Sequence, residues 1–353
     1  MEFPQTNRAL RFNRIAGDLF VDEEEIPPPP SNELLVKVHA ASVNPVDIQL
    51  WRSGLVGVVA DNKGMGRDFS GTVVAVGSDV KGWKEDDDIF GLLFHVFGQG
   101  TFSQYINVNP ASDPVAKKPT SLKHEQASSI PLVAMTAFSC LVWLPPLLPN
   151  STSSRKVAIR GASGGTGMWL VQLAKVVYDC HVTAICSTRN AEFVRGLGAD
   201  QVIDYTKEEV ASALGSERTL TKQDYDLIVD CVGGTGLLSI YPQILNPKGA
   251  YVTIVGDKTN VKSIGGPITY LTSPGQVWRY IQGWIWGPRY GCIALYTKTA
   301  YVEQVARLAD RGEVKVEIQE VIEGAFDERE GWRKAIKLME EGRVRGKVVL
   351  AIP

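Results

Sequence analysis

The stretch Arg155-Lys156-Val157-Ala158-Ile159-Arg160-Gly161-Ala162-Ser163-Gly164-Gly165-Thr166-Gly167 decides the fold. Its first six residues predict a buried strand, and residues 168–177 after it predict a helix. The glycines at positions 161, 164 and 167 allow a tight turn and let backbone N–H groups approach a pyrophosphate at the helix N-terminus. Between a strand and a helix these glycines predict a dinucleotide site, and a tight turn without a ligand is the alternative.

The alternation of strands and helices continues along the chain. Further strands are predicted at 181–186, 201–204, 225–230 and 250–256. Helices are predicted at 191–197 and at 125–141, the latter broken by Pro131. This alternation implies an α/β fold with a doubly wound parallel sheet of the Rossmann type, which we expect within residues 127–313.

The first 120 residues have another character, because short strands follow one another there with glycine-rich turns. These strands are predicted at 33–39, 71–77, 88–91 and 102–108. Their close spacing favours a barrel-like β domain. At the end of the chain, a helix is predicted at 329–341 and a strand at 347–352.

Composition excludes several classes of protein. The 353 residues exceed what one hydrophobic core usually serves, so two domains are expected. Lys plus Arg (37) nearly equals Asp plus Glu (39), which leaves no overall charge footprint for nucleic acid or an anionic membrane. Five dispersed cysteines argue against a disulfide framework, and no apolar run predicts a membrane span. Since no signal peptide is recognisable, a cytoplasmic location is expected.

The end of the second strand of the alternating region indicates the nucleotide. The residues Cys186-Ser187-Thr188-Arg189-Asn190 contain no carboxylate, whereas NAD sites usually place Asp or Glu there to bind the ribose diol. The hydroxyl of Ser187 and the guanidinium of Arg189 suit a 2′-phosphate instead, which predicts NADPH as the cofactor. Arg189 as a solvated loop residue is the alternative.

No metal site is predicted. The cysteines, at positions 140, 180, 186, 231 and 292, and the four histidines, at 39, 95, 124 and 181, are dispersed along the chain. Structural zinc sites commonly use clustered cysteines. The cysteines are therefore expected to be small buried hydrophobic residues.

Five further stretches carry a family resemblance. They are Ser42-Val43-Asn44-Pro45-Val46-Asp47, Gly66-Arg67-Asp68-Phe69-Ser70-Gly71, Ile130-Pro131-Leu132-Val133-Ala134-Met135-Thr136-Ala137, Leu197-Gly198-Ala199-Asp200-Gln201-Val202-Ile203-Asp204-Tyr205 and Gly346-Lys347-Val348-Val349-Leu350. With the glycine turn, they make the chain similar to the medium-chain dehydrogenase/reductase superfamily, and within it to the zinc-free quinone oxidoreductases and enoyl reductases. The resemblance covers nearly the whole chain. It implies a GroES-like catalytic domain of β-barrel type at residues 1–126, completed by residues 314–353.

The chain departs from the zinc-dependent members of that superfamily. Where zinc alcohol dehydrogenases carry a Cys it has Asn44, and where they carry a His-Glu pair it has Arg67-Asp68. The four-Cys structural zinc loop is absent too. Without a Lewis acid, reducing a conjugated C=C bond is easier than polarising an alcohol or a simple carbonyl. Some enoyl reductases have a Tyr proton donor close to the position of Leu55, so a proton donor is unassigned here.

The resemblance also implies the cofactor contacts. The residues that it implies for NADPH are Asn44, Asp47, Thr136, Ser163, Gly164, Gly165, Thr166, Ser187, Arg189, Tyr205, Cys231, Val255, Gly256 and Lys347. Asn44 and Thr136 are also the candidate catalytic residues, because the family places them near the nicotinamide. The alternatives are a turn residue before Pro45 for Asn44, a capping or packing role for Thr136, and a surface aromatic for Tyr205.

Residues 259–290 separate two predicted strands and contain Trp278, Trp284 and Trp286. A connection of this length inside a compact domain is usually functional or partly helical. We expect an apolar wall or lid for a bulky substrate. A dimer surface and an amphipathic helix packed on its own domain are the alternatives.

The expected function is NADPH-dependent reduction, without zinc, of the C=C bond of an α,β-unsaturated carbonyl or of a quinone. The expected partner is a small hydrophobic unsaturated substrate, with no nucleic acid, and a homodimer is compatible with this reading. One alternative is a trans-acting enoyl reductase that serves a polyketide synthase. The other is an NADPH-binding protein without enzymatic activity.

Overall fold

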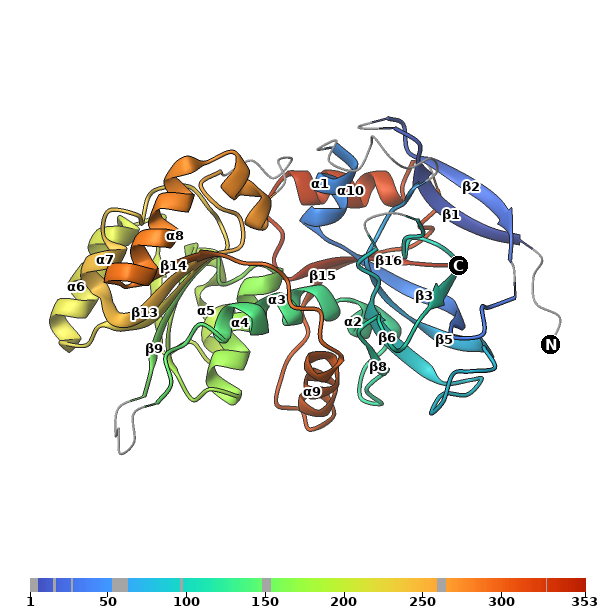
Figure 1. Ribbon diagram of the computed structural model, residues 1–353, viewed down its shortest axis with the longest axis horizontal. Coiled ribbons are helices and arrows are strands. Elements are labelled where there is room, and N and C mark those ends of the chain that lie inside the picture. Colours follow the sequence, from blue (N-terminus) through green and yellow to red (C-terminus); the bar gives the residue numbers. More distant parts are fainter. Residues whose placement is uncertain are drawn as a thin grey trace. The chain divides into compact units, whose positions relative to one another are not determined.

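The computed structural model describes residues 6–14, 17–26, 28–52, 63–95, 98–147, 154–258, 265–327 and 329–353. Contacts within the chain divide it into two compact units (Figure 1). Unit 1 comprises Met1–Met135 and Thr297–Pro353, and unit 2 comprises Thr136–Asn260 and Ile264–Tyr296, as far as these ranges are described. The domain limits expected at 126/127 and 313/314 stay predictions.

Unit 2 is built on a six-stranded sheet in which all neighbouring strands are parallel. Its strands follow the order β11-β10-β9-β12-β13-β14. They are β9 (Lys156–Arg160), β10 (His181–Cys186), β11 (Gln201–Asp204), β12 (Tyr225–Asp230), β13 (Leu245–Thr253) and β14 (Arg289–Cys292). The order reverses between β9 and β12, and Rossmann sheets bind their ligands outside the carboxyl ends of the strands at this switch point.

Helices cover both faces of this sheet, which explains why its strands read as continuous apolar runs. In Figure 1, α4 (Gly165–Val176) and α5 (Ala191–Gly196) lie on one face, and the other face carries α6 (Val210–Thr221), α7 (Tyr241–Ile244) and α8 (Pro274–Trp286). Two short 3₁₀ helices, η1 (Thr188–Asn190) and η2 (Gly266–Leu271), precede α5 and α8. The helix α3 (Pro131–Leu141) leads into the unit from unit 1.

Unit 1 contains a seven-stranded sheet in the order β15-β16-β3-β5-β6-β8, with β7 paired to β3, and a three-stranded sheet in the order β2-β1-β4. Its strands are β1 (Thr6–Phe12), β2 (Phe20–Glu25), β3 (Leu34–Val43), β4 (Lys63–Gly64), β5 (Asp68–Val76), β6 (Asp88–Leu92), β7 (Tyr105–Val108), β8 (Val115–Lys117), β15 (Ile318–Ile322) and β16 (Lys347–Ala351). Its helices are α1 (Pro45–Arg52), α2 (His124–Ser128), α9 (Thr299–Asp310) and α10 (Trp332–Glu340). Since Val348 of β16 pairs with Val43 of β3, the end of the chain joins the sheet formed by strands from its first 120 residues.

The predicted α/β class, with a parallel Rossmann-type sheet and a separate β-rich unit, is confirmed. The predicted helix at 125–141 is two helices, because Pro131 begins α3 after α2 has ended. The strand predicted from residue 102 begins only at Tyr105, since Ser103 forms an isolated bridge with Ala9 of β1. Among the described residues, no helix combines the length and the apolar character that crossing a membrane requires.

Candidate cofactor site

The glycine turn between β9 and α4 has the conformation of an anion-binding turn. Gly161 has a φ of +80°, which L side chains rarely adopt, and Gly164 is the N-cap of α4. A Cβ added at Gly167 would lie 2.1 Å from the carbonyl oxygen of Gly161, so only glycine lets the helix approach the turn this closely. Gly165, Thr166 and Gly167 form the first turn of α4, where backbone N–H groups lack intrahelical acceptors and can bind a phosphate.

Asn190 joins this turn to the end of the second strand. Its Nδ2 donates to Ser163 Oγ (2.9 Å) and, at a longer distance, to Ser187 Oγ (3.5 Å). Asn190 is buried, and the two serines that it links are both predicted cofactor residues. Asn190 was not singled out from the sequence. Its position directly before a predicted helix was the available signal, because Asn is a favoured N-cap residue.

A carboxylate from the third strand lies beside the expected 2′-phosphate site. Asp204 ends β11 and accepts hydrogen bonds from Thr188 Oγ1 and from Thr206 Oγ1 (2.6 Å). These hydrogen bonds, that of Thr188 first, lower the pKa of Asp204 to about 2, so it is ionised at neutral pH. Lys207 Nζ lies 3.6 Å from Asp204 Oδ2 and offsets part of this charge. The end of β10 itself carries no carboxylate, but the Asp204 charge next to it was not foreseen.

Arg189 and Tyr205 follow these two strand ends, and both side chains are exposed. They lie on adjacent parallel strands, because Cys186 at the end of β10 pairs with Asp204 at the end of β11. The structure therefore brings the predicted residues Ser187, Arg189 and Tyr205 to one edge of the sheet. Their contacts with the adenosine end of a cofactor stay predictions.

Asp230, at the end of β12, organises the middle of the same edge. Its carboxylate is fully buried and accepts hydrogen bonds from Arg160 Nη1 (3.1 Å) and Tyr251 OH (2.6 Å). It also accepts the backbone N–H groups of Val232 (2.8 Å) and Gly233 (2.9 Å), which fixes the loop after the strand. The predicted residue Cys231 begins this loop, and burial raises the pKa of its thiol well above the usual value. Neither Arg160 nor Asp230 was singled out from the sequence.

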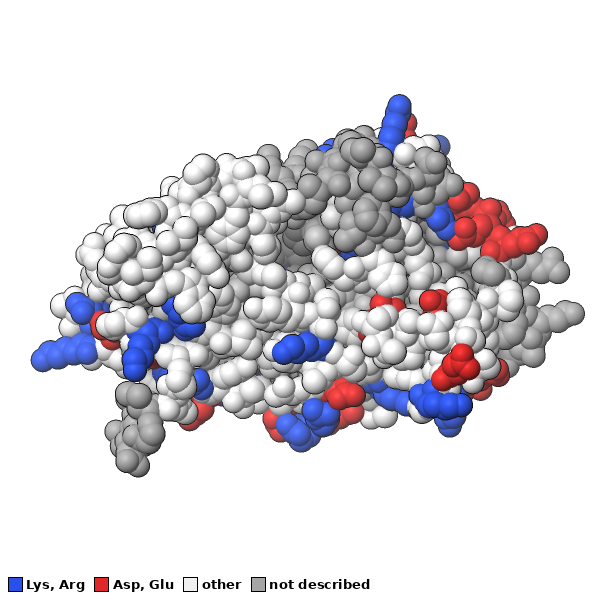
Figure 2. Space-filling view, in the orientation of Figure 1, with Lys and Arg blue, Asp and Glu red and all other residues white. Residues whose placement is uncertain are grey.

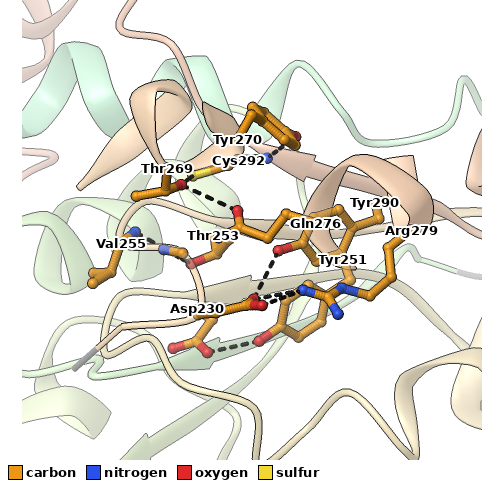
Figure 3. A network of polar contacts seen from close by, with 12 residues as sticks. Asp230, Tyr251, Thr253, Val255, Thr269, Tyr270, Gln276, Arg279, Tyr290 and Cys292 are labelled. Carbon is orange, nitrogen blue, oxygen red and sulfur yellow. Dashed lines mark hydrogen bonds and ion pairs between the residues drawn. The ribbon is translucent and has the colours of Figure 1, made fainter. Parts of the chain in front are cut away.

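The end of β13 is shaped by Thr253 (Figure 3). Its hydroxyl oxygen accepts the backbone N–H groups of Val255 (3.2 Å) and Gly256 (2.9 Å). Gly256 has a φ of +93°, and a Cβ there would lie 2.8 Å from the hydroxyl of Thr269. The strand predicted at 250–256 therefore ends at Thr253, and Val255 and Gly256 follow it at the carboxyl edge of the sheet, in a turn that requires a glycine.

The predicted residues of unit 1 form a separate buried polar cluster. Asn44 donates from Nδ2 to Asp68 Oδ2 (2.8 Å) and accepts at Oδ1 from Lys347 Nζ (2.5 Å). Asp68 also accepts from Ser42 Oγ (2.8 Å) and from the backbone N–H of Leu132 (2.8 Å) in the first turn of α3. Asn44, Asp68 and Lys347 are all buried, and the amide of Asn44 is engaged at both ends. This geometry makes Asn44 the residue that holds Lys347 and Asp68 together.

Asp47 and Arg67 extend the cluster. Asp47 Oδ2 accepts the backbone N–H of Asn44 (2.8 Å), while its buried Oδ1 has no hydrogen-bond partner among the described residues. Burial raises the pKa of Asp47 to about 6, against the opposing charge of Arg67. Burial likewise raises the pKa of Asp68 and lowers that of Lys347. In this buried cluster, any ionised side chain without an opposite charge nearby costs free energy.

These residues do not fit a catalytic zinc ion. An amide that is already bonded to both neighbours stands at position 44, and the Lys347 ammonium lies 3.6 Å from Asp68 Oδ2. The ammonium group of Lys347 therefore competes with a metal ion for the negative charge of the Asp68 carboxylate. Nor do the described parts of the chain contain any group of three or more His, Cys, Asp or Glu side chains that could hold a metal ion.

Three other predictions concern residues outside both the carboxyl edge of the unit 2 sheet and the buried cluster of unit 1. Thr136 lies on α3 and is half-buried. The tryptophans at 278, 284 and 286 lie on α8 with exposed side chains. Leu55 falls outside the described residues. Roles for Thr136 in catalysis and for the tryptophans in substrate binding stay predictions.

A parallel sheet of order 3-2-1-4-5-6 with a glycine turn after its first strand defines a Rossmann dinucleotide-binding protein. Two family models match the chain: the alcohol dehydrogenase GroES-like domain at residues 30–120 and the zinc-binding dehydrogenase at residues 197–350. The mouse mitochondrial NAD(P)H oxidoreductase RTN4IP1 is 35% identical over 91% of this chain and 82% of its own length. The chain belongs to the medium-chain dehydrogenase/reductase superfamily, among its quinone oxidoreductase and enoyl reductase members.

Other relatives agree with this placement. The trans-enoyl reductase pgmF of Aspergillus terreus is 31% identical over 99% of this chain and 97% of its own length. The Escherichia coli quinone oxidoreductase, solved with NADPH, has a TM-score of 0.76 and 21% identity over 98% of this chain and 100% of its own, a likeness of fold. The resemblance and the GroES-like unit predicted from the sequence are thereby confirmed. The mouse relative is named as mitochondrial, so a cytoplasmic location stays a prediction.

Proposed function

We propose that this oxidoreductase uses NADPH to reduce the C=C bond of an α,β-unsaturated carbonyl, or a quinone, without zinc. The observation that carries the proposal is the hydrogen bond between Asn190 and Ser163 (2.9 Å). It ties the phosphate-binding turn to the strand end that bears Ser187 and Arg189. A cofactor held by the turn would reach that strand end with the ribose of its adenosine.

The residues of unit 2 fit such a cofactor. The first turn of α4, with Ser163, Gly164, Gly165 and Thr166 before and within it, would bind the pyrophosphate. Ser187 and the guanidinium of Arg189 would bind a 2′-phosphate. Cys231, Val255 and Gly256 stand farther along the same edge and would lie near the nicotinamide end. Bound NADPH would supply the hydride, and the work of the protein is to bind and orient it.

Zinc independence is supported by the cluster of Asn44, Asp68 and Lys347. Its hydrogen bonds are directed inward, so it offers no open ligand position to a substrate oxygen. An acceptor that is already conjugated needs less help, because its own carbonyl receives the charge. The one proton that completes the reduction after hydride transfer would come from water or from a side chain.

Coenzyme titration tests the proposal. NADPH is expected to bind at least about tenfold more tightly than NADH, a difference of about 1.4 kcal/mol. Arg189→Ala should remove most of this preference while NADH affinity changes little. Arg195→Ala is the matched control, because Arg195 is an exposed arginine on α5 whose partner is Glu192. Equal affinity of the unmodified protein for both coenzymes would contradict the proposal. The ionised carboxylate of Asp204, which lies beside the expected 2′-phosphate site, would then be the first group to examine.

A trans-acting enoyl reductase is the second candidate. It is supported by the Aspergillus terreus relative, which is named a trans-enoyl reductase and matches nearly the full length. Such an enzyme would reduce an enone carried by a polyketide synthase far faster than the same enone free in solution. Equal turnover of carrier-bound and free enone would favour the small-molecule reductase instead.

A further inference from the structure

Helix α8 exposes an apolar face. Five of its residues, Val277, Trp278, Ile281, Trp284 and Ile285, are exposed, and they follow the spacing i, i+1, i+4, i+7, i+8 of one helix face. The side chains of Trp278 and Trp284 are 59% and 60% exposed. None of the five carries a charge. An amphipathic helix, one of the alternatives for this segment, is present, but its apolar side faces outward instead of packing on its own domain.

Polar and small residues occupy the inward side and hold the helix in this orientation (Figure 3). Gln276 is fully buried, and its Oε1 accepts the hydroxyl proton of Thr269 (3.1 Å). Arg279 donates to both carboxylate oxygens of Asp257 (2.6 Å each), and its guanidinium lies 4.9 Å from the centre of the Tyr290 ring. A Cβ at Gly283 would lie 2.8 Å from the backbone nitrogen of Tyr290. Rotating the apolar face inward would break these contacts, so they stabilise the orientation in which the apolar face is exposed.

The exposed face is of the size at which apolar patches are often functional. Trp278, Trp284 and the three aliphatic side chains together present on the order of 400–500 Å² of mostly apolar surface. The largest apolar patch of a typical monomer is roughly 300–600 Å², and such a patch is often an interaction site.

Sheet extension by a second copy is disfavoured beside this face. The edge strand β14 has four residues and follows Pro288, which has no N–H to donate. The backbone N–H of Cys292 is already bonded to the hydroxyl of Tyr270 (2.8 Å). The ring of Trp143 lies where a side chain at Gly291 would stand. Short, covered edges of this kind prevent pairing between strands of two molecules.

The chemistry of the face matches a bilayer surface. Tryptophan is favoured where an apolar interior meets water, because its indole is apolar and its N–H needs a polar partner. Positive charge stands at the C-terminal end of the helix, where Gly287 packs on Pro247, the neighbour of exposed Lys248. Arg289 lies there too, and its Nη2 donates to the carbonyl oxygens of Trp143 (2.6 Å) and Lys248 (3.3 Å). Figure 2 shows an almost uncharged surface over the region of α8.

We propose that α8 docks the protein on an anionic bilayer, lying in the interface with Trp278, Ile281 and Trp284 inserted and Lys248 at the headgroups. Helices with Trp, Phe or Leu on an apolar face lie in the membrane interface without crossing it, and each basic residue near the surface adds attraction to anionic lipids. The net charge of the whole chain, −2, does not reveal a local surface such as the one at α8. The inference goes beyond the proposed reaction and does not rest on it.

Vesicle co-sedimentation with the full chain tests the proposal. The protein is expected to sediment with vesicles of phosphatidylcholine containing one third phosphatidylserine, and less with phosphatidylcholine alone. The double variant Trp278→Ser/Trp284→Ser should bind roughly tenfold more weakly. Lys248→Ala should weaken binding to the anionic vesicles about fivefold and reduce its dependence on salt. Leu220→Ser is the matched control, because Leu220 is 83% exposed on α6, and it should bind like the unmodified protein.

Three results would overturn the proposal. They are no binding to either vesicle, equal binding by the double tryptophan variant, and a dimer that this variant converts to a monomer, which would assign the face to a second copy. If the double variant melts early, Ile285→Asp replaces it. Ile285 is exposed, and a carboxylate there should prevent binding to anionic vesicles while leaving the inward contacts of α8 intact.

Discussion

Alanine substitutions at two glycines of the β9–α4 turn are expected to affect stability and cofactor binding separately. A Cβ added at Gly167 would lie 2.1 Å from Gly161 O and 2.7 Å from Ala162 Cα, both of them backbone atoms that cannot move without displacing the turn. At Gly164 the nearest atom to an added Cβ is Gly161 O at 3.5 Å, an ordinary contact, and φ is −80°. Alanine therefore fits at position 164 but not at position 167.

The expected magnitudes follow from these distances. Overpacking at Gly167 costs about 3 kcal/mol, offset by about 1 kcal/mol of helix propensity, so Gly167→Ala should lower the melting temperature by roughly 4–8 °C. Gly164→Ala loses a few tenths of a kcal/mol at the N-cap and gains a similar amount from a less flexible unfolded chain, so stability should stay within about 0.5 kcal/mol. A methyl group at this N-cap blocks the approach of the pyrophosphate, and the Kd for NADPH should rise at least about tenfold.

Differential scanning fluorimetry and titration of NADPH fluorescence measure the two effects on the same samples. Gly164→Ala should be as stable as the unmodified protein and deficient in NADPH binding. If Gly164→Ala binds NADPH like the unmodified protein, no phosphate rests on this turn, and the assignment of the cofactor site is wrong. If Gly167→Ala melts normally, the close approach of α4 to the turn is not required for the fold.

Three further outcomes are expected. Lys347→Met leaves the buried Asp68 without its cation and should destabilise the protein by about 3 kcal/mol in urea unfolding, with Asp68→Asn/Lys347→Met recovering part of the loss. Exhaustive chelation should leave the reductase activity unchanged, and elemental analysis that finds one zinc per chain, lost together with activity, would contradict this. Burial lowers the pKa of His124 to about 4 and also lowers that of His39, whose ring centre is 4.4 Å away. Because the unfolded chain binds these protons first, stability should fall as the pH drops from about 6.5 toward 4, and His124→Gln should flatten this dependence.

The parts of the fold that local sequence determines were predictable. Strands buried on both faces appear as apolar runs, and the glycine turn after β9 is required by a positive φ and by a close contact within a few residues. The break at Pro131 is local as well. Ser187, Gly164 and Gly256 lie at the carboxyl edge for the same local reason, because each follows the end of a parallel strand, and their contacts with a cofactor stay predictions.

The contacts between strand ends could not be predicted in the same way. Asn190 reaches Ser163 across 27 positions, and Arg160 reaches Asp230 across 70. Each pair is set by the order of the strands in the sheet, which no local pattern contains. The charge of Asp204 beside Thr188 depends in the same manner on β11 lying next to β10. Helix α8 shows the limit most clearly. A helix was only one of the alternatives for this segment, and its inward side is selected by Asp257 and Thr269, which contact Arg279 and Gln276.

The buried cluster of unit 1 also bears on the class of reaction. A zinc ion would act on a substrate oxygen through an open ligand position. Lys347 cannot act in this manner, because its ammonium is bonded to Asn44 Oδ1 (2.5 Å) and Val43 O (3.2 Å) and lies beside Asp68. Turning it toward a substrate would leave the carboxylate of Asp68 buried without a cation, which costs several kcal/mol. Substrates whose own conjugated carbonyl accepts the negative charge avoid this cost, and this is the chemical reason to expect enones and quinones rather than alcohols.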